Sequence, residues 1–218
     1  MEYPKSKLNK VIRGNKRAVY NQDKIFDILD NNSLCYVSFI WENQPIVLPT
    51  SYGRKGEYLY LHGSASSRML EQMTNGQQVC INVTELNGIV LAKTLFHTSV
   101  NFRSVVLFGK AEEITDYDEK IKGLEIIVNQ MIPHRWDEVS LGDDNEIKAT
   151  KVIKFKIESA SAKIRTGAPS DEITDPAIWS GEIPIKYVGQ KPIPANTSEP
   201  ENYPESVKEF LKKNKQES

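Results

Sequence analysis

The sequence contains very little cysteine: Cys35 and Cys80 are the only two in 218 residues. They lie far apart in apolar segments and form no C-x-x-C pair, which disfavours a zinc site or a disulfide framework. The three histidines, His62, His97 and His134, also lack the spacing of metal ligands. We therefore expect no metal site, and we interpret both cysteines as reduced thiols in the core.

Other common features are also missing. No segment approaches the roughly 18 consecutive apolar residues of a membrane span, and the polar segment 1–10 lacks the apolar region of a signal peptide. The formal net charge is only −1, and Lys and Arg are spread along the chain. Neither a G-x-G-x-x-G nor a G-x-x-x-x-G-K-S/T motif occurs. We therefore expect a cytoplasmic protein that binds neither nucleic acid nor membranes and has no Rossmann site or P-loop.

The segment Tyr58–Arg68 has the clearest pattern in the chain. Its first four residues are typical of a strand, Gly63 marks a turn, and helical spacing follows. Ser66 or Ser67 is placed to cap that helix, and Arg68 comes directly after them. Unpaired backbone N–H groups at a helix start attract anions, so this turn is a candidate phosphate site. The alternative is that the serines only cap the helix.

Helices are predicted where apolar residues recur on one face. Asn21 caps an amphipathic segment that stops at 30–32, and Asp116 with Glu119 resembles a capping box for a helix that ends before Pro133. A last short, exposed helix is expected at 205–213.

Strands are predicted at 34–41, 46–52, 58–61, 77–84, 89–96, 105–108 and 150–157. The first is apolar on both faces, which suits a central strand covered on each side. Pro49 cannot donate a ladder hydrogen bond and so marks an edge or a bulge. Asn87–Gly88 predicts a hairpin turn, and the polar segment 97–104 is expected to be a loop.

The order of these elements indicates a mainly β protein. About six or seven strands joined mostly by hairpins, with helices at irregular intervals, favour an antiparallel barrel with flanking helices. From Thr166 the sequence is rich in Pro, Gly and Asp, so this part either covers the barrel or reaches a neighbouring chain. The predicted division is an N-terminal arm at 1–17, which lies on the domain or is mobile, a barrel at 18–165, a C-terminal extension at 166–195 and a tail at 196–218.

Several blocks of sequence resemble a known family. They are R-A-V-Y near residue 20, L-P-T-S-Y, L-Y-L-H-G-S-A-S-S-R, F-H-T-S-V-N-F-R-S-V-V-L-F-G, A-S-A-K-I-R-T-G and W-S-G-E-I-P. Over residues 17–194 the chain is similar to the pyridoxamine 5'-phosphate oxidase-related FMN-binding split-barrel proteins, within them to the branch that includes nitroimidazole-resistance proteins. The resemblance implies a split antiparallel β-barrel and a homodimer with FMN in a groove between the subunits.

The resemblance also implies which residues hold FMN. The strand along the isoalloxazine ring is matched by Pro49, Thr50, Ser51 and Tyr52. The strand end and helix start that hold the phosphate are matched by His62, Gly63, Ser66, Ser67 and Arg68. The block that lines the flavin from the next strand is matched by Asn101, Phe102, Arg103 and Ser104, with Arg103 as donor toward the pyrimidine end. Trp179 matches a tryptophan that covers the flavin from the partner subunit.

Proton delivery has two candidates, His62 and His97, and for each a purely structural, hydrogen-bonded role is the alternative. The main functional hypothesis is an FMN-dependent oxidoreductase that takes electrons from NAD(P)H or another donor and passes them to a small acceptor, for example a nitroaromatic compound. The alternatives are a non-catalytic split-barrel protein that binds FMN, haem or another planar ligand, and an unliganded interaction module. Vitamin B6 oxidation is not expected, because the C-terminal segment lacks the family's substrate-binding arginine motif.

Overall fold

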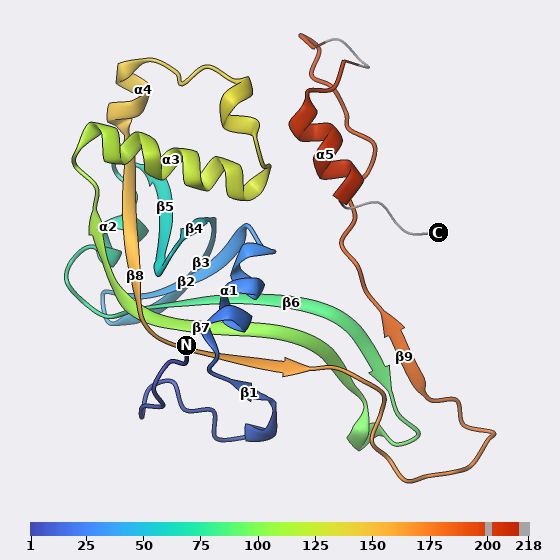
Figure 1. The fold of residues 1–218 in the computed structure, drawn as a ribbon. Coiled ribbons are helices and arrows are strands. Elements are labelled where there is room, and N and C mark those ends of the chain that lie inside the picture. The colour runs from blue at the N-terminus through green and yellow to red at the C-terminus, as the bar shows by residue number, and fades with distance from the viewer. Residues whose placement is uncertain (199–201, 214–218) are drawn as a thin grey trace.

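The computed structural model of the protein describes residues 1–198 and 202–213. Antiparallel strands make up the body of this part of the chain, with helices around them (Figure 1). The strands are β1 (Ala18–Val19), β2 (Leu34–Trp41), β3 (Gln44–Ser51), β4 (Gly53–Lys55), β5 (Tyr58–Ser64), β6 (Val79–Leu91), β7 (Ser99–Glu113), β8 (Thr150–Arg165) and β9 (Gly181–Pro184). The α-helices are α1 (Gln22–Asp30), α2 (Arg68–Met73), α3 (Tyr117–Met131), α4 (Asp144–Ala149) and α5 (Glu205–Lys213), and the 3-10 helices are η1 (Asn15–Arg17), η2 (Leu95–His97) and η3 (Arg135–Glu138).

The strands form one antiparallel sheet that curls into a split barrel. Its order is β3-β2-β6-β7-β8-β5-β4, with β1 paired to β8 and β9 paired to β6. The two ends of this order, β3 and β4, are separated in the chain by Tyr52 alone, so the sheet returns on itself. The expected fold class, a mainly β split barrel with flanking helices, is confirmed. Among the described residues, no helix is both long and apolar enough to cross a membrane.

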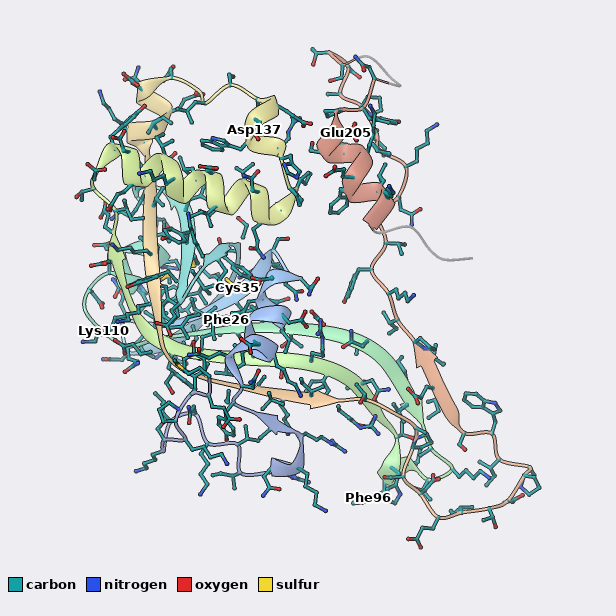
Figure 2. The ribbon with its side chains drawn as sticks, in the orientation of Figure 1. Phe26, Cys35, Phe96, Lys110, Asp137 and Glu205 are labelled. Atoms are coloured by element: carbon teal, nitrogen blue, oxygen red, sulfur yellow. The ribbon has the colours of Figure 1, made fainter. Side chains whose placement is uncertain are left out.

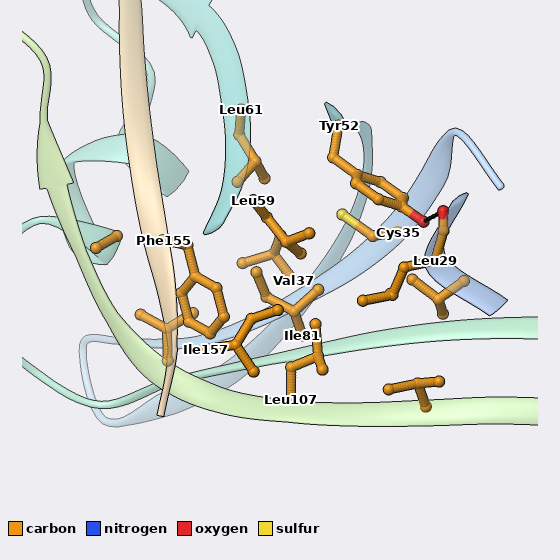
Figure 3. Close-up of a cluster of buried hydrophobic side chains, with 14 of the residues drawn as sticks. Leu29, Cys35, Val37, Tyr52, Leu59, Leu61, Ile81, Leu107, Phe155 and Ile157 are labelled. Atoms are coloured by element: carbon orange, nitrogen blue, oxygen red, sulfur yellow. Dashed lines mark hydrogen bonds between the residues drawn. The ribbon is translucent and has the colours of Figure 1, made fainter. Parts of the chain in front are cut away.

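Apolar side chains fill the inside of the barrel. Alternate strand residues point inward, so Val37 of β2 meets Leu59 and Leu61 of β5 in one cluster (Figure 3). Tyr52 is fully buried there, and its hydroxyl donates a hydrogen bond of 2.6 Å to the carbonyl oxygen of Leu29. This bond ties the end of α1 to the barrel and satisfies a polar group that would otherwise be costly to bury.

Both cysteines lie on strands, as expected, and both are free thiols. Cys35 on β2 is buried, whereas Cys80 on β6 is partly exposed. Burial raises the pKa of the Cys35 thiol to about 12. Cys35 is therefore protonated near neutral pH and acts as a small apolar core residue.

Strand β2 is covered on one face only, and the prediction that both faces are covered is wrong. Cys35 and Val37 are fully buried, but Leu34, Tyr36 and Ile40 on the opposite face are 49%, 41% and 50% exposed. β2 lies next to the edge strand β3, where the barrel is split. An apolar run cannot by itself distinguish a strand covered by its own chain from one that leaves an apolar face open.

The hairpin turn predicted at Asn87–Gly88 is also wrong, because this dipeptide forms a β-bulge inside one long strand. β6 is continuous, and its register against β7 shifts between Leu86 and Gly88. A Cβ at Gly88 would lie 3.0 Å from the carbonyl oxygen of Ile183 in β9. Gly88 therefore lets the backbone of β9 approach β6 closely, and it does not form a turn.

The outer parts of β6, β7 and β9 form a curved sheet that projects past the barrel (Figure 1). We call residues 86–91, 99–103 and 181–184 the sheet extension. The segment 97–104, predicted as a loop, lies mostly in β7, whereas β6 is the middle strand of the extension, between β7 and β9. Residues 99–101 pair with β6 alone, and residues 102–104 also pair with the end of β8.

The N-terminal arm lies on the domain. Tyr3 is buried, and its backbone N–H donates a hydrogen bond of 2.9 Å to the carbonyl oxygen of Tyr20. Asn9 is also buried, and its side-chain Nδ2 donates to the carbonyl oxygen of Ala160 at 3.1 Å. These contacts decide in favour of the packed arm over the mobile one.

Local capping signals fixed the starts of two helices correctly. The side chain of Asn21 accepts from the backbone N–H of Lys24 at the start of α1, and that of Asp116 accepts from Glu119 at the start of α3. Helix α4 was not predicted, although Asp143 begins it with a complete capping box.

Helix α5 is present as predicted, but one residue of its first turn, Ser206, packs against η3 and is not exposed. Ser206 is buried, and its backbone N–H donates to Glu138 Oε1 in η3 at 2.9 Å. Figure 2 shows Asp137 of η3 and Glu205 of α5 on the two sides of this contact. Residues 199–201 and 214–218 of the predicted tail lie outside the described residues.

Candidate functional site

The turn between β5 and α2 gathers hydroxyl groups at the start of a helix. Ser67 is the N-cap, and its Oγ accepts from the backbone N–H of Leu70 at 3.4 Å. Ser64 Oγ lies 3.0 Å from Ser66 Oγ, and both side chains are exposed. The turn therefore presents two exposed serine hydroxyls beside the start of a helix, and we call residues 64–68 the anion seat.

Gly63 allows the strand to end close against this helix. A Cβ there would lie 3.2 Å from Leu70 Cδ1, which is tighter than ordinary packing. The backbone N–H of Ala65 donates to the carbonyl oxygen of Ala149 at 2.9 Å, so α4 fixes the turn from the other side. The shape of the seat therefore depends on three neighbouring elements.

Arg68 brings a positive charge to the seat. Its side chain is exposed, and its guanidinium carbon lies 5.1 Å from the centroid of the Trp41 ring. A cation over an aromatic face is held in place while its N–H groups stay available. No carboxylate in the described part of the chain forms an ion pair with Arg68. Trp41 is a site residue that the sequence analysis missed, because its place at the end of the 34–41 strand gives no sign of the turn it faces.

The predicted ring-binding residues lie on and just after the edge strand β3. Pro49, Thr50 and Ser51 pair with β2 on one side only, so the outer side of this backbone is open to a ligand. Tyr52 differs from the other three, because its side chain is in the core and its hydroxyl is already hydrogen-bonded. Desolvation raises the pKa of Tyr52, so it stays a neutral donor. The backbone N–H of Tyr52 is engaged as well, because it donates to the carbonyl oxygen of Ser33 at 3.2 Å.

The two histidines proposed for proton delivery lie far apart within one chain. His62 pairs with Val152, whereas the block that follows His97 pairs with the other end of β8 at Arg165. Thirteen residues of strand correspond to roughly 40 Å. Figure 2 shows Phe96, the neighbour of His97, at the tip of the sheet extension. A single chain therefore does not bring the two imidazoles together.

The surroundings of the two histidines also differ. His62 Nδ1 is buried without a hydrogen-bond partner among the described residues. Burial lowers the pKa of His62 from its ordinary value, so the imidazole is neutral at pH 7. His97 Nδ1 lies 2.8 Å from Thr94 Oγ1. That hydrogen bond fixes the orientation of the ring and leaves Nε2 directed elsewhere.

The residues of the block 101–104 have different contacts. Arg103 is bound by two carboxylates: its Nε donates to Glu85 Oε2 at 2.6 Å and its Nη1 to Asp27 Oδ2 at 2.5 Å. The hydrogen bond to Glu85, followed by that to Asp27, raises the pKa of Arg103. The pair ties α1 to β6 and β7, and it engages the guanidinium that the sequence analysis assigned to a ligand.

The other members of the block have separate partners. Asn101 is buried, and its Nδ2 donates to Glu182 Oε2 of β9 at 2.7 Å. Phe102 and Ser104 are partly exposed on the alternate positions of β7. Trp179 is 64% exposed in the loop before β9 and packs against Gly181. In one chain, Asn101 lies in the sheet extension and Trp179 in the loop that leads into it, whereas the seat lies on the barrel.

No group of His, Cys, Asp and Glu side chains with the arrangement of a metal site is found within residues 1–198 and 202–213. The candidate site consists of an anion seat on the barrel, an open strand edge at β3, and a projecting sheet that carries aromatic and polar residues.

Comparisons with known proteins agree with the split-barrel fold. A family model described as pyridoxamine 5'-phosphate oxidase matches residues 21–164. The flavocytochrome Anf3 from Azotobacter vinelandii is 36% identical, with 94% of this chain and 97% of that chain covered and a TM-score of 0.87. No curated protein gives a significant match.

Two further solved structures are similar. The FAD- and haem-binding protein from Mycobacterium smegmatis is 29% identical, with 89% of this chain and 97% of that chain covered and a TM-score of 0.83. A protein from Bacteroides thetaiotaomicron VPI-5482, assigned to 5-nitroimidazole antibiotic resistance, is 26% identical, with 67% and 86% covered and a TM-score of 0.57.

Proposed function

The chain belongs to the pyridoxamine 5'-phosphate oxidase family, and on this premise we propose that it is a flavin-dependent oxidoreductase. The observation that carries the proposal is the similarity to a flavocytochrome along 94% of the chain, at 36% identity. A bound flavin supplies the chemistry of hydride and electron transfer, and the protein supplies binding and electrostatics. No pair of nucleophile and base is then needed.

The seat fits the phosphate of a flavin. A phosphate ester carries between one and two negative charges at pH 7. Ser66, Ser67 and the start of α2 offer hydroxyl and backbone donors, and Arg68 offers a guanidinium with no carboxylate partner among the described residues. His62 lies in β5 directly before Gly63 and is neutral at pH 7. It would therefore add a hydrogen-bond donor or acceptor to the seat, but no charge. FMN, the flavin expected from the sequence, and FAD share this phosphate.

The edge of β3 fits the flavin ring. Its backbone at Thr50 and Ser51 would pair with the polar edge of the isoalloxazine, whereas Pro49 has no N–H and the N–H of Tyr52 already donates to Ser33. Arg103 stays a prediction as a donor to the pyrimidine end, and its two carboxylate partners reduce the charge that it has left to offer.

We propose that two copies of the chain complete the site. Ile89, Val100 and Ile183 lie opposite one another across three strands of the sheet extension, and they are 37%, 40% and 47% exposed. Such an apolar band on a projecting sheet supports burial against a second copy. The partner would then bring residues of its extension, Trp179 among them, to the flavin seat of the first copy.

Reduction of bound flavin by a nicotinamide tests the function. We expect the purified protein to bind FMN or FAD with quenching of flavin fluorescence, and the 450 nm flavin absorbance to bleach when NADH or NADPH is added without oxygen. Addition of a nitroaromatic compound should then restore the oxidised spectrum. Stopped-flow absorbance measures both steps, and free flavin under the same conditions is the control.

Two outcomes would contradict this function. A flavin that binds but is reduced no faster than free flavin would indicate a non-catalytic binding protein. If the protein quenches the fluorescence of neither FMN nor FAD, the proposal is wrong, and an unliganded interaction module is favoured.

Haem binding is a second candidate, favoured by a specific observation. Two of the similar structures, at TM-scores of 0.87 and 0.83, are described as a flavocytochrome and as a haem-binding protein. In this chain the imidazole of His97 is held by Thr94 and flanked by Leu95 and Phe96, which are 95% and 89% exposed. An oriented imidazole beside apolar surface is suited to the axial side of haem.

We expect the protein to bind haemin with a sharp Soret band, and His97→Ala to shift or remove that band. His134→Ala is the control, since His134 is an exposed histidine that precedes η3 on another part of the molecule. The measurement is the absorbance of ferric and dithionite-reduced protein. A His97→Ala spectrum identical to that of the wild type would exclude His97 as a ligand.

A further inference from the structure

Arg165, the last residue of β8, is a buried cation with incomplete hydrogen bonding. The residue is only 7% exposed. Its Nη1 donates to Asn101 Oδ1 and, at 3.4 Å, to the carbonyl oxygen of Gly167. Its Nε is buried and has no acceptor in the part of the chain that the structure describes. A buried guanidinium normally has all of its N–H groups satisfied, so an acceptor is missing here.

No carboxylate in the described residues neutralises this charge by direct contact. The nearest acidic group in the network is Glu182, but its Oε2 accepts from Asn101 Nδ2 at 2.7 Å. The Asn101 amide therefore stands between the carboxylate and the guanidinium, with its Oδ1 turned to Arg165. Burial of a charge without a paired opposite charge is costly, which favours an anion from outside the chain.

A pocket lies on the open side of Arg165. It has a volume of ≈ 290 Å³ and is lined by Arg17, Ile164, Arg165, Thr166, Ala168 and Ser170. Arg17 is the last residue of η1, and the other five residues come from the end of β8 and the loop after it. Two arginines and two hydroxyl-bearing residues, Thr166 and Ser170, thus line one cavity, and no acidic residue lines it.

We propose that this pocket binds the phosphate group of a small phosphorylated molecule. Two arginines match the charge of a phosphate dianion, and their planar forks suit its oxygens. The volume is close to the lower end of small-molecule sites and leaves room for a modest organic group beside the phosphate. The pocket lies at the opposite end of β8 from the β5–α2 seat, so within one chain it is a second site and does not depend on the flavin proposal.

Titration of the full-length protein with inorganic phosphate and with acetate, at constant ionic strength, tests the site. We expect saturable binding of phosphate by isothermal titration calorimetry, at least about tenfold tighter than that of acetate, because a dianion meets both arginines. Arg17→Gln should weaken phosphate binding about tenfold by loss of one charge-assisted contact. Lys16→Gln, which removes a neighbouring exposed cation that does not line the pocket, should change it less than twofold.

Arg17 is exposed, so its substitution tests the site without disturbing the core. Arg165→Lys is the second variant: it keeps the charge but loses the fork, and we expect intermediate phosphate affinity. Absence of saturable binding, equal affinities for phosphate and acetate, or equal losses in the Arg17 and Lys16 variants would overturn the proposal. Displacement of the phosphate by FMN or FAD, with Arg17→Gln weakening the flavin equally, would show that the pocket belongs to the flavin site instead.

Discussion

Gly109→Ala should destabilise the protein more than any other single methyl group added to the sheet. Gly109 lies in β7 where the register against β8 shifts by one residue. A Cβ there would lie far inside the van der Waals contact distance to the Lys156 carbonyl oxygen and 3.1 Å from Phe155 Cζ. The obstructing atom is backbone and cannot move without separating two central strands. We expect a loss of roughly 3 kcal/mol or more in the free energy of unfolding.

Thermal unfolding followed by circular dichroism measures this effect. For a chain of this size, roughly 3 kcal/mol corresponds to a fall in Tm of roughly 6–12 °C. Gly56→Ala is the control, because Gly56 has a φ of +60° and nothing within 4 Å of its Cβ position. That variant should cost only about 1–2 kcal/mol, from the left-handed backbone alone. Equal losses in the two variants would mean that the clash at Gly109 is relieved by a small backbone shift.

The parts of the fold that were predictable from the sequence depend on local chemistry. A side-chain oxygen at Asn21 or Asp116 caps a helix through contacts within three residues, and such contacts are visible in the sequence. The Asn87–Gly88 dipeptide is equally local, yet its meaning is decided by β9, which is almost 100 residues away along the chain. A turn and a bulge use the same residue types, so only the third strand distinguishes them.

The same limit applies to β2 and to the polar segment after His97. Leu34, Tyr36 and Ile40 are apolar whether their own chain or a second copy covers them, and the sequence does not say which. Residues 99–103 lie in β7, where successive side chains point to opposite faces, so polar residues alternate with Val100 and Phe102. The polar character of this segment was therefore a property of a half-buried strand, although it is also typical of a loop.

The same distinction between local and long-range contacts applies to the candidate site. The β5–α2 turn was found because strand, turn and cap follow one another in ten residues. The Arg103 pairs with Asp27 and Glu85, by contrast, join three elements, and nothing near Arg103 in the sequence indicates that its charge is already engaged. The Arg165 pocket is missed for the same reason, since Arg17 and Arg165 meet only when β1 pairs with β8.

Arg68→Ala should cause the largest change in flavin binding of any single substitution at the seat. Arg68 is the guanidinium of the seat, and its exposed position over Trp41 means that its removal leaves the core untouched. A hydrogen bond to a charged group contributes about 1.5–3 kcal/mol, which corresponds to a loss of roughly 10- to 150-fold in FMN affinity. Arg68→Lys should lose less, because it keeps the charge but not the planar fork. Quenching of flavin fluorescence gives the dissociation constants.

Riboflavin makes this test specific for the phosphate, because it has the same ring and ribityl chain but no phosphate group. If Arg68 binds the phosphate, the wild-type protein and Arg68→Ala should bind riboflavin with affinities within about twofold, and only FMN and FAD should distinguish them. Added salt should also weaken FMN binding more than riboflavin binding, since it screens exposed charges. Lys24→Ala removes an exposed cation from α1 and should leave all three affinities unchanged. An equal loss for riboflavin and FMN in Arg68→Ala would place the ring, rather than the phosphate, beside this arginine, and the β5–α2 turn would then be only a helix cap.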